Sequence, residues 1–215
     1  MERYKVIALK VGFLETNCYI VRDTESGCCC VIDPGADAAL IKSTMRELDT
    51  KCTLILLTHG HFDHILALED MRTTRAVVAI HASDAHCLTE RDSFSPMLPY
   101  DPRPFSSADV LLKREGTYEL GGFTFRITHT PGHTAGSVCY IFDDMLFTGD
   151  TLFCSGIGRT DFPGSSAEQM NASLKKLYHM PGDYVVYPGH GEKTLLSDER
   201  DSNPYMAFIR RESRQ

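Results

Sequence analysis

The sequence predicts a mixed α/β domain, and two observations carry that prediction. Segments rich in β-branched and aromatic residues, which favour strands, fall into two sets, and each set has helical segments attached to it. Several of these strand-like segments run into Thr, Gly or Pro and then into a His or an Asp. The length of 215 residues suits one domain, residues 1–215, with a sizeable core.

In the first half of the chain, three strands come first, and helices and strands then alternate. Asp33, Pro34 and Gly35 predict a turn after the third strand. The segment that follows this turn can place its apolar residues on one face of a helix. The expected elements are strands at 4–10, 18–22, 29–33, 52–57 and 76–80, and helices at 37–48, 64–71 and 83–88.

A long loop is expected at 92–108. It contains four prolines among serines and aspartates, and it could cover a site, form a contact in a homodimer, or run over the surface. Strand signals resume after it, and one later segment places Met170, Leu174 and Leu177 on one helical face. The expected elements are strands at 110–112, 117–120, 123–128, 138–142, 145–148 and 184–187, and helices at 166–178 and 204–210.

The motif Thr-His-Gly-His-Phe-Asp-His at 58–64 places four metal-binding side chains, His59, His61, Asp63 and His64, within six positions. It directly follows a predicted buried strand, so it lies on a loop, where functional groups commonly occur. Three imidazoles packed this closely repel one another when they are protonated and cost free energy when they are buried without partners. A divalent cation removes both problems, because it binds neutral imidazole and ionised carboxylate.

Three further ligand-type residues follow strand-like segments downstream. His133 lies in Thr-Pro-Gly-His, Asp150 in Gly-Asp-Thr-Leu-Phe, and His190 in Tyr-Pro-Gly-His. A single Pro-Gly-His is more often a turn than a site. Four ligand-bearing strand ends in one chain, however, predict a metal site.

Seven ligands exceed the four that one tetrahedral zinc takes, and they suit two metals. The first metal could be held by His59, His61 and His133, and the second by Asp63, His64 and His190, with Asp150 bridging them. Imidazole and carboxylate donors suit two divalent ions, with zinc favoured and iron or manganese compatible. A hydroxide between two such metals is a nucleophile at neutral pH.

Together these motifs resemble the metallo-β-lactamase superfamily. The match runs from 58 to 190, and Asn-Cys-Tyr-Ile-Val at 17–21 with Val-Ile-Asp-Pro-Gly at 31–35 extends it toward the N-terminus. The resemblance implies a four-layer αββα sandwich of two mixed sheets flanked by helices, and it implies the seven ligand roles given above. Within the superfamily the chain is similar to glyoxalase II-like hydrolases, which cleave S-acylglutathione thioesters at a binuclear metal site. Asp63 and Asp150 are then the expected catalytic residues.

Three other activities of the same fold remain open, namely those of a persulfide dioxygenase, a lactonase and a β-lactamase. A persulfide dioxygenase would use a single iron held by His59, His133 and Asp150. A lactonase would use the same binuclear site on a different substrate. A serine hydrolase is not expected, because no Gly-x-Ser-x-Gly motif occurs.

Two residues outside the ligand set are candidates for supporting roles. Arg159 lies in a glycine-rich segment, at the offset from Asp150 where a basic residue contacts substrate in the glutathione thioesterases that the chain resembles. It could pair with a substrate carboxylate or form a structural salt bridge. Asp33 follows an apolar strand, where it could orient one of the imidazoles or serve only as a turn residue.

Composition narrows the classes of partner. The net charge of −7 argues against a nucleic-acid surface, and no apolar run reaches the length of a membrane helix. The eight cysteines include three consecutive ones and no Cys-x-x-Cys spacing, so we expect reduced thiols and a cytoplasmic location. The expected partner is a small-molecule thioester substrate.

Overall fold

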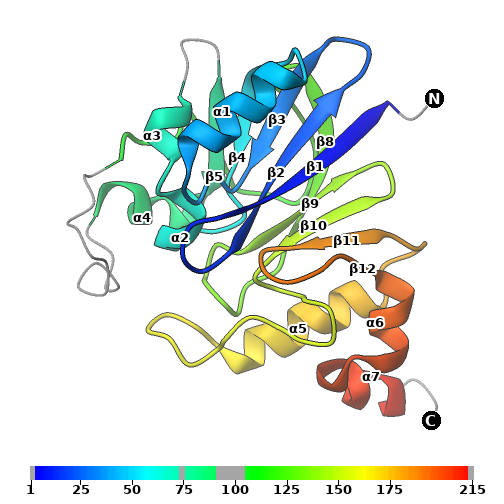
Figure 1. The fold of residues 1–215 in the computed structure, drawn as a ribbon. Coiled ribbons are helices and arrows are strands. Elements are labelled where there is room, and N and C mark those ends of the chain that lie inside the picture. The colour runs from blue at the N-terminus through cyan, green and yellow to red at the C-terminus, as the bar shows by residue number, and fades with distance from the viewer. Residues whose placement is uncertain (1–2, 73–75, 91–104, 213–215) are drawn as a thin grey trace.

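The computed structural model describes residues 3–72, 76–90 and 105–212. Two six-stranded sheets lie face to face, and helices cover their outer faces (Figure 1). This arrangement confirms the predicted sandwich of two mixed sheets flanked by helices. The site predicted from the strand ends therefore has to lie along one edge of this sandwich.

The first sheet has the strand order β1-β2-β3-β4-β5-β6. Its first three strands are antiparallel, whereas β3, β4, β5 and β6 run parallel to one another. The carboxyl ends of the parallel strands therefore meet at one edge of the sheet. The strands are β1 Tyr4–Val11, β2 Thr16–Asp23, β3 Cys28–Ile32, β4 Lys51–Leu56, β5 Val77–His81 and β6 Val110–Leu112.

The second sheet has the order β12-β11-β10-β9-β8-β7. Only β10 and β11 are parallel, and the other neighbours are antiparallel. The strands are β7 Gly116–Leu120, β8 Phe123–His129, β9 Val138–Phe142, β10 Met145–Gly149, β11 Val185–Pro188 and β12 Thr194–Leu195.

The main core fills the space between the two sheets. Aromatic residues from both sheets meet there, and Phe142 packs edge-on against both Tyr4 and Phe147. The hydroxyl of Tyr140, on the second sheet, donates to the carbonyl of Leu57 at the end of β4, at 2.7 Å. This bond joins the sheets directly before the motif at 58–64, so packing between the sheets fixes where that motif begins.

Helices bury the outer faces of the sheets. Helix α1 contributes Ile41 to the core over the first sheet, and α5 contributes Met170, Leu174 and Leu177 to the core over the second. The helices are α1 Ala38–Glu47, α2 Phe62–Ile65, α3 Leu68–Met71, α4 His86–Thr89, α5 Ala167–Tyr178, α6 Leu196–Ser202 and α7 Ala207–Glu212, with short 3₁₀ turns η1 Ala82–Asp84 and η3 Pro204–Met206.

The structure corrects several expected boundaries. The single helix predicted at 64–71 is two short helices, α2 and α3. The chain leaves helical geometry at Ala67, whose amide donates to the Pro34 carbonyl. The strand predicted at 184–187 is not the last one, because the two-residue β12 and then α6 follow it. The predicted terminal helix begins as a 3₁₀ turn at Pro204 and continues as α7.

Most of the proline-rich loop predicted at 92–108 lies outside the described residues, and Phe105 resumes the chain with a backbone hydrogen bond to Leu88. All eight cysteines are described, and each is a free thiol, as the sequence predicted. No helix within the described residues is both long enough and apolar enough to cross a membrane.

Candidate metal centre

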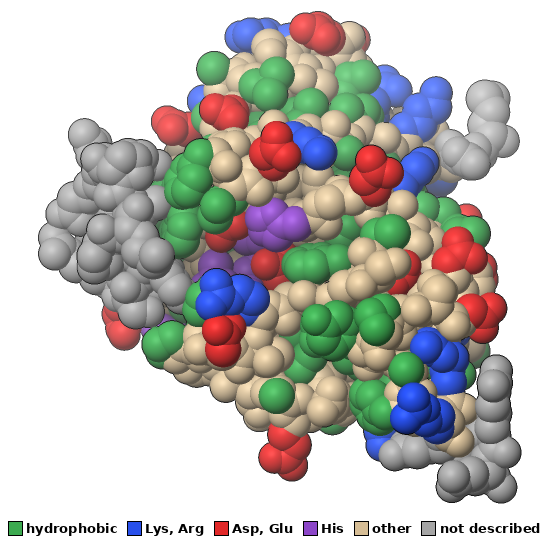
Figure 2. All heavy atoms as spheres, turned by 60° about the horizontal axis from the view of Figure 1, so that its bottom comes forward, with side chains coloured by type: hydrophobic (Ala, Val, Ile, Leu, Met, Phe, Trp, Pro, Cys, Tyr) green, Lys and Arg blue, Asp and Glu red, His purple; other side chains and the backbone are tan. Residues whose placement is uncertain are grey.

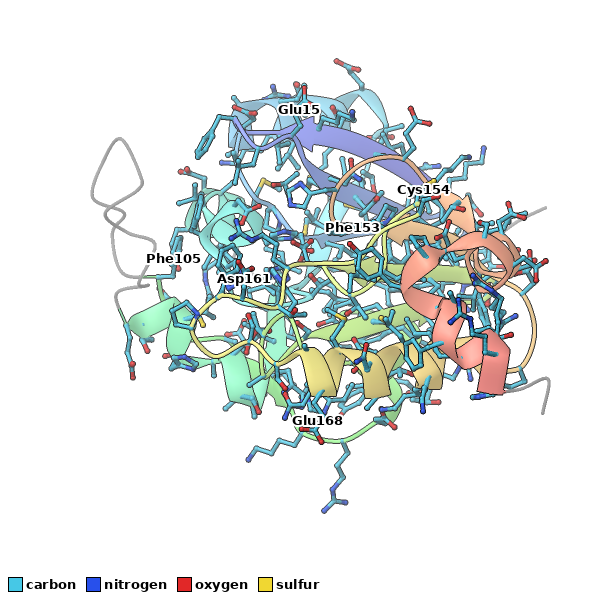
Figure 3. The ribbon with its side chains drawn as sticks, turned by 90° about the horizontal axis from the view of Figure 1, so that it is seen from below. Glu15, Phe105, Phe153, Cys154, Asp161 and Glu168 are labelled. Carbon is cyan, nitrogen blue, oxygen red and sulfur yellow. The ribbon has the colours of Figure 1, made fainter. Side chains whose placement is uncertain are left out.

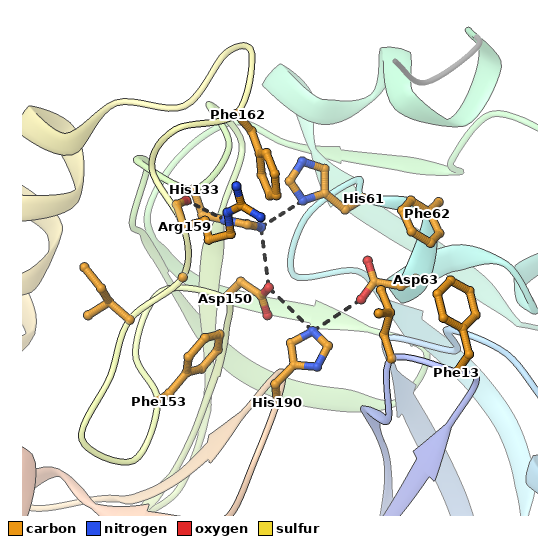
Figure 4. A pocket seen from close by; sticks show the side chains of 13 residues that line it. Phe13, His61, Phe62, Asp63, His133, Asp150, Phe153, Arg159, Phe162 and His190 are labelled. Carbon is orange, nitrogen blue, oxygen red and sulfur yellow. Dashed lines mark hydrogen bonds and ion pairs between the residues drawn. The ribbon is translucent and has the colours of Figure 1, made fainter. Parts of the chain in front are cut away.

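The seven predicted ligand residues come together at one edge of the sandwich (Figure 4 labels five of them). The motif at 58–64 follows β4 and leads into α2. His133 follows β8, Asp150 follows β10, and His190 follows β11. Residues from both sheets therefore converge, as the repeated pattern of strand, turn and ligand indicated.

Three imidazoles form the first group of ligand atoms, which we call the His59 group: His59, His61 and His133. One nitrogen from each ring lies within 4.8 Å of the others. Nδ1 of His61 is 2.8 Å from Nε2 of His133. Nδ1 of His133 donates to the carbonyl of Arg159 at 2.8 Å, which leaves the Nε2 lone pair of that ring facing the group.

The second group, which we call the His190 group, consists of Asp63, His64 and His190, again with ligand atoms within 4.8 Å. Oδ2 of Asp63 is 3.5 Å from Nε2 of His64 and 3.3 Å from Nε2 of His190. The Thr16 hydroxyl donates to the same oxygen at 2.9 Å and so holds the carboxylate in place.

Asp150 lies between the two groups. Its Oδ1 is 3.4 Å from Nε2 of His64, and its Oδ2 is 3.4 Å from Nε2 of His133 and 3.7 Å from Nε2 of His190. One carboxylate therefore contacts imidazoles of both groups. This is the position that a bridging ligand needs.

These residues fit divalent metal ions. Among the described residues, Nε2 of His59, Nε2 of His64 and Oδ1 of Asp150 are buried and have no hydrogen-bond partner. Buried polar atoms without partners are costly, and a metal ion satisfies imidazole nitrogens and carboxylate oxygens together. These three atoms lie where the two groups meet, and they are of the donor types that such a metal site uses. The residues present therefore fit a metal site made of imidazoles and carboxylates.

Protonation states agree with that fit. Burial, together with the neighbouring imidazoles, lowers the pKa of His59 well below its usual value and that of His61 to about 3, so both rings are neutral. Burial opposes charge on His64 too, but the carboxylates of Asp63, Asp150 and Asp33 outweigh it and raise the pKa of His64. A cation placed among these carboxylates would take over the role of that proton.

Asp33 contacts His64 directly and His59 through the Thr58 hydroxyl. Its Oδ2 accepts from Nδ1 of His64 at 2.9 Å and from the Thr58 hydroxyl at 2.6 Å. Because that hydroxyl donates to Asp33, its oxygen is left to accept from Nδ1 of His59, 3.1 Å away. Both rings are thereby held with Nε2 toward the centre, which is the arrangement by which a carboxylate orients metal-binding histidines.

Glycine is required where the ligand loops approach most closely. A Cβ at position 189 would overlap Oδ1 of Asp150, and a Cβ at position 35 would overlap the backbone carbonyl of Asp63. Larger residues at these two positions would push ligand residues out of place. The glycines in the Pro-Gly-His and Asp-Pro-Gly segments are thus part of the site.

Sequence reasoning missed one buried carboxylate beside the centre. Asp84, in η1 after β5, accepts hydrogen bonds from the amides of Gly60 and Gly136 and from the Thr134 hydroxyl. No motif surrounds this residue, and its only signal is its position after a parallel strand next to β4. Two histidines outside the predicted ligand set, His81 and His129, stack on each other with ring centroids 4.2 Å apart and belong to neither group.

A pocket of about 610 Å³ opens above both groups. Figure 2 shows the histidines at the bottom of a hollow edged by hydrophobic side chains. Its lining residues are Phe13, Leu14, His61, Phe62, Asp63, His133, Asp150, Phe153, Ile157, Gly158, Arg159, Phe162 and His190. Small-molecule sites commonly have this size and this mixture of apolar wall and few polar groups.

Arg159 lines the pocket, but its guanidinium is already paired. Its Nε and Nη2 donate to the two carboxylate oxygens of Asp161 at 2.9 and 2.7 Å. Figure 3 places Asp161 and Phe153 on the segment that leads from β10 to α5. Of the two roles open to Arg159, the described contacts are those of a local salt bridge.

Comparison with known proteins places the chain among metallo-hydrolases. The model of the metallo-beta-lactamase superfamily matches residues 11–190. A hydroxyacylglutathione hydrolase of Haemophilus influenzae is 35% identical over an alignment of 210 positions, which covers 92% of this chain and 96% of that protein.

Two solved structures are similar over nearly the whole chain. One is the BLEG-1 B3 metallo-beta-lactamase, with a TM-score of 0.88 and 33% identity, covering 94% of this chain and 100% of that one. The other is TTHA1623 in a di-iron-bound form, with a TM-score of 0.80 and 30% identity, covering 93% and 99%.

We expect Asp33→Asn to weaken metal binding by about 10- to 100-fold. Asp33 accepts on both carboxylate oxygens, from the Thr58 amide at Oδ1 and from the Thr58 hydroxyl and His64 at Oδ2. An amide has only one accepting oxygen, so its NH2 group would face one of these donors, and His64 would lose its fixed orientation. Zinc titration against a competing chelator measures the change. Asp23→Asn is a matched control, because Asp23 is equally buried and its side chain accepts, among the described residues, from the turn at Glu25 and Ser26 and from Arg3, away from the metal ligands. Equal affinities for the two variants would contradict the orienting role of Asp33.

Proposed function

The chain belongs to the metallo-β-lactamase superfamily, and we propose that within it the protein is a binuclear metal-dependent thioesterase of the glyoxalase II kind. Its substrates would be S-acylglutathione-type thioesters. The observation that carries this proposal is the position of Asp150 between two complete groups of ligand atoms, at the base of one open pocket.

Two relatives support the proposal. One similar protein is named a hydroxyacylglutathione hydrolase, which is the activity proposed here. Another was solved with two irons, which agrees with two metal positions in this chain. We assign His59, His61 and His133 to one metal, Asp63, His64 and His190 to the other, and Asp150 to both, with zinc favoured and iron or manganese compatible.

Bound metals would polarise the thioester carbonyl and supply a deprotonated water at neutral pH. The residues of the chain itself keep the carboxylates of Asp63 and Asp150 ionised. Burial opposes ionisation of Asp63, but His64, His190 and Thr16 stabilise the carboxylate and keep its pKa below the usual range. The imidazoles around Asp150 act in the same way against its burial. Both carboxylates therefore stay ionised, which is the form that binds a cation.

The described lining of the pocket offers no hydroxyl, thiol or amine as a nucleophile. Among the described residues that line it there is no Ser, Thr, Cys or Lys. Water is therefore the nucleophile that this lining supports, in agreement with the missing serine-hydrolase motif.

A mononuclear dioxygenase is the second candidate to be tested. It would need only His59, His133 and Asp150. Asp63, His64 and His190 are as closely assembled as the first three imidazoles, and Thr16 and Asp33 hold two of them in position, so residues for a second metal are present. Such residues can persist in persulfide dioxygenases, so metal content and activity separate the two candidates. A lactonase would share both metals and differ only in its substrate.

Metal content measured together with two assays tests the proposal. We expect about two metals per chain and release of free thiol from S-lactoylglutathione or another S-acylglutathione. One iron per chain with oxygen consumption on glutathione persulfide would instead establish the dioxygenase. Hydrolysis of lactones with no thiol release would establish a lactonase.

Asp150→Ala should lower kcat for thioester hydrolysis by at least about 100-fold, which is the loss typical for one preorganised electrostatic group. The fold should survive, because Asp150 contacts ligand residues at the edge of the sandwich and not the core. Circular dichroism and steady-state kinetics would check both points. Asp144→Ala, at an exposed turn between β9 and β10, serves as the control. If Asp150→Ala kept the wild-type rate, Asp150 would not bridge the metals.

A further inference from the structure

We propose that the pocket selects thioesters whose acyl group is apolar, an inference that rests on the proposed thioesterase function. Six apolar side chains form what we call the apolar rim: Phe13, Leu14, Phe62, Phe153, Ile157 and Phe162. Figure 4 labels four of them, and it shows Phe13, Phe62, Phe153 and Phe162 around the ligand residues.

The apolar rim is built from three separate segments. Phe13 and Leu14 lie in the hairpin between β1 and β2, Phe62 begins α2, and the other three lie between β10 and α5. The Phe13 and Phe62 rings stack with their centroids 6.4 Å apart. Segments far apart in the sequence thus contribute one kind of side chain to the same opening.

Two exposed apolar side chains in the hairpin between β1 and β2 indicate that an apolar ligand binds there. Phe13 is 66% exposed and Leu14 is 44% exposed, which makes them two of the few large hydrophobic side chains left open to solvent in the described chain. Exposed apolar groups that gather at a pocket contribute little to folding and usually mark a binding surface. An apolar group entering the pocket would bury them.

Charge around the mouth agrees with an apolar ligand. Apart from the five ligand residues that line the pocket, Arg159 is the one charged residue among its described lining residues. Its guanidinium is paired to both oxygens of Asp161 and lies 4.2 Å above the Phe162 ring. The polar ligands at the base suit a thioester carbonyl, and the walls above them suit a hydrocarbon chain.

An acyl series on a constant thiol carrier tests this inference. The metal-loaded enzyme is assayed with S-propionyl-, S-butyryl-, S-hexanoyl- and S-lactoylglutathione, of which the lactoyl and propionyl esters differ only by one hydroxyl. Burying one methylene improves affinity up to about fourfold, so we expect kcat/KM to rise about two- to fourfold per methylene. We also expect the propionyl ester to be cleaved at least as well as the lactoyl ester.

Two variants tie this slope to the hairpin. Leu14→Ala and Phe13→Ala should flatten the rise of kcat/KM with chain length. Leu111→Ala is the matched control, because Leu111 is 43% exposed on β6 and does not line the pocket. A flat or falling series, a preference for the lactoyl ester, or an unchanged slope in both hairpin variants would overturn the inference while leaving thioester hydrolysis established. If no ester were cleaved, the proposed function itself would fail, and this inference with it.

A different observation carries a second inference: we infer that Asp84 is a positioning residue for the His59 group. Its two carboxylate oxygens reach both loops that supply this group. Oδ2 accepts from the Gly60 amide at 3.0 Å, between His59 and His61, and from the Thr134 hydroxyl at 2.7 Å, next to His133. Oδ1 accepts from the Gly136 amide at 2.7 Å.

The packing leaves no freedom around this carboxylate. A Cβ at position 136 would overlap the Asp84 carboxyl group, and a Cβ at position 60 would come within 2.5 Å of the Cys87 Cβ. Asp84 is itself buried, and its three hydrogen-bond donors offset the cost of burying its carboxylate. It contacts no residue of the His190 group through a described hydrogen bond. Its effect should therefore be confined to one metal.

Zinc occupancy at each position tests the role of Asp84. In crystals of Asp84→Asn, anomalous scattering should show zinc retained at the His190 group and depleted at the His59 group. Zinc titration should show that the affinity of the His59 group is about 10- to 100-fold weaker. The cobalt(II) spectrum of that site should change as well. Thr134→Val, which removes one donor and leaves the carboxylate, should shift affinity in the same direction by less, and it serves if Asp84→Asn does not fold. Equal occupancy at both positions with wild-type affinity would overturn the inference.

Discussion

The burial of several imidazoles and carboxylates at one place is the constraint on which the rest of this structure depends. Nε2 of His59, Nε2 of His64 and Oδ1 of Asp150 are buried without hydrogen-bond partners among the described residues. Such an arrangement is unfavourable for a stable fold on its own, since each buried polar atom loses its hydration. Metal ions supply what these atoms lack, so folding and metal binding are expected to be coupled.

The fold is suited to assembling such a cluster. Three neighbouring parallel strands, β3, β4 and β5, end at the same edge and are followed by Asp33, by the motif at 58–64 and by Asp84. The second sheet brings His133, Asp150 and His190 to that edge from the other side. Asp33 and Asp84 therefore lie on either side of the loop that carries the motif at 58–64, and each follows a strand adjacent to β4.

Much of this could be predicted from the sequence, because periodic apolar patterns and clustered ligands are local signals. The helix at 166–178 and the strand at 138–142 agree with the structure to within a residue at each end. The two-residue β12 carries too few residues for any pattern, and the break between α2 and α3 depends on a tertiary contact of Ala67 with Pro34. The role of Asp84 was not predictable for the same reason, and for Arg159 the sequence left a salt bridge open without naming Asp161, since such partners are set by how loops pack.

The most direct measurement is a crystal structure of the protein grown with excess zinc or iron, with anomalous data collected at the metal edge. The account predicts two peaks, one among His59, His61 and His133 and one among Asp63, His64 and His190, with Asp150 contacting both. Imidazoles turned away from one another around a cleft without any peak would contradict it.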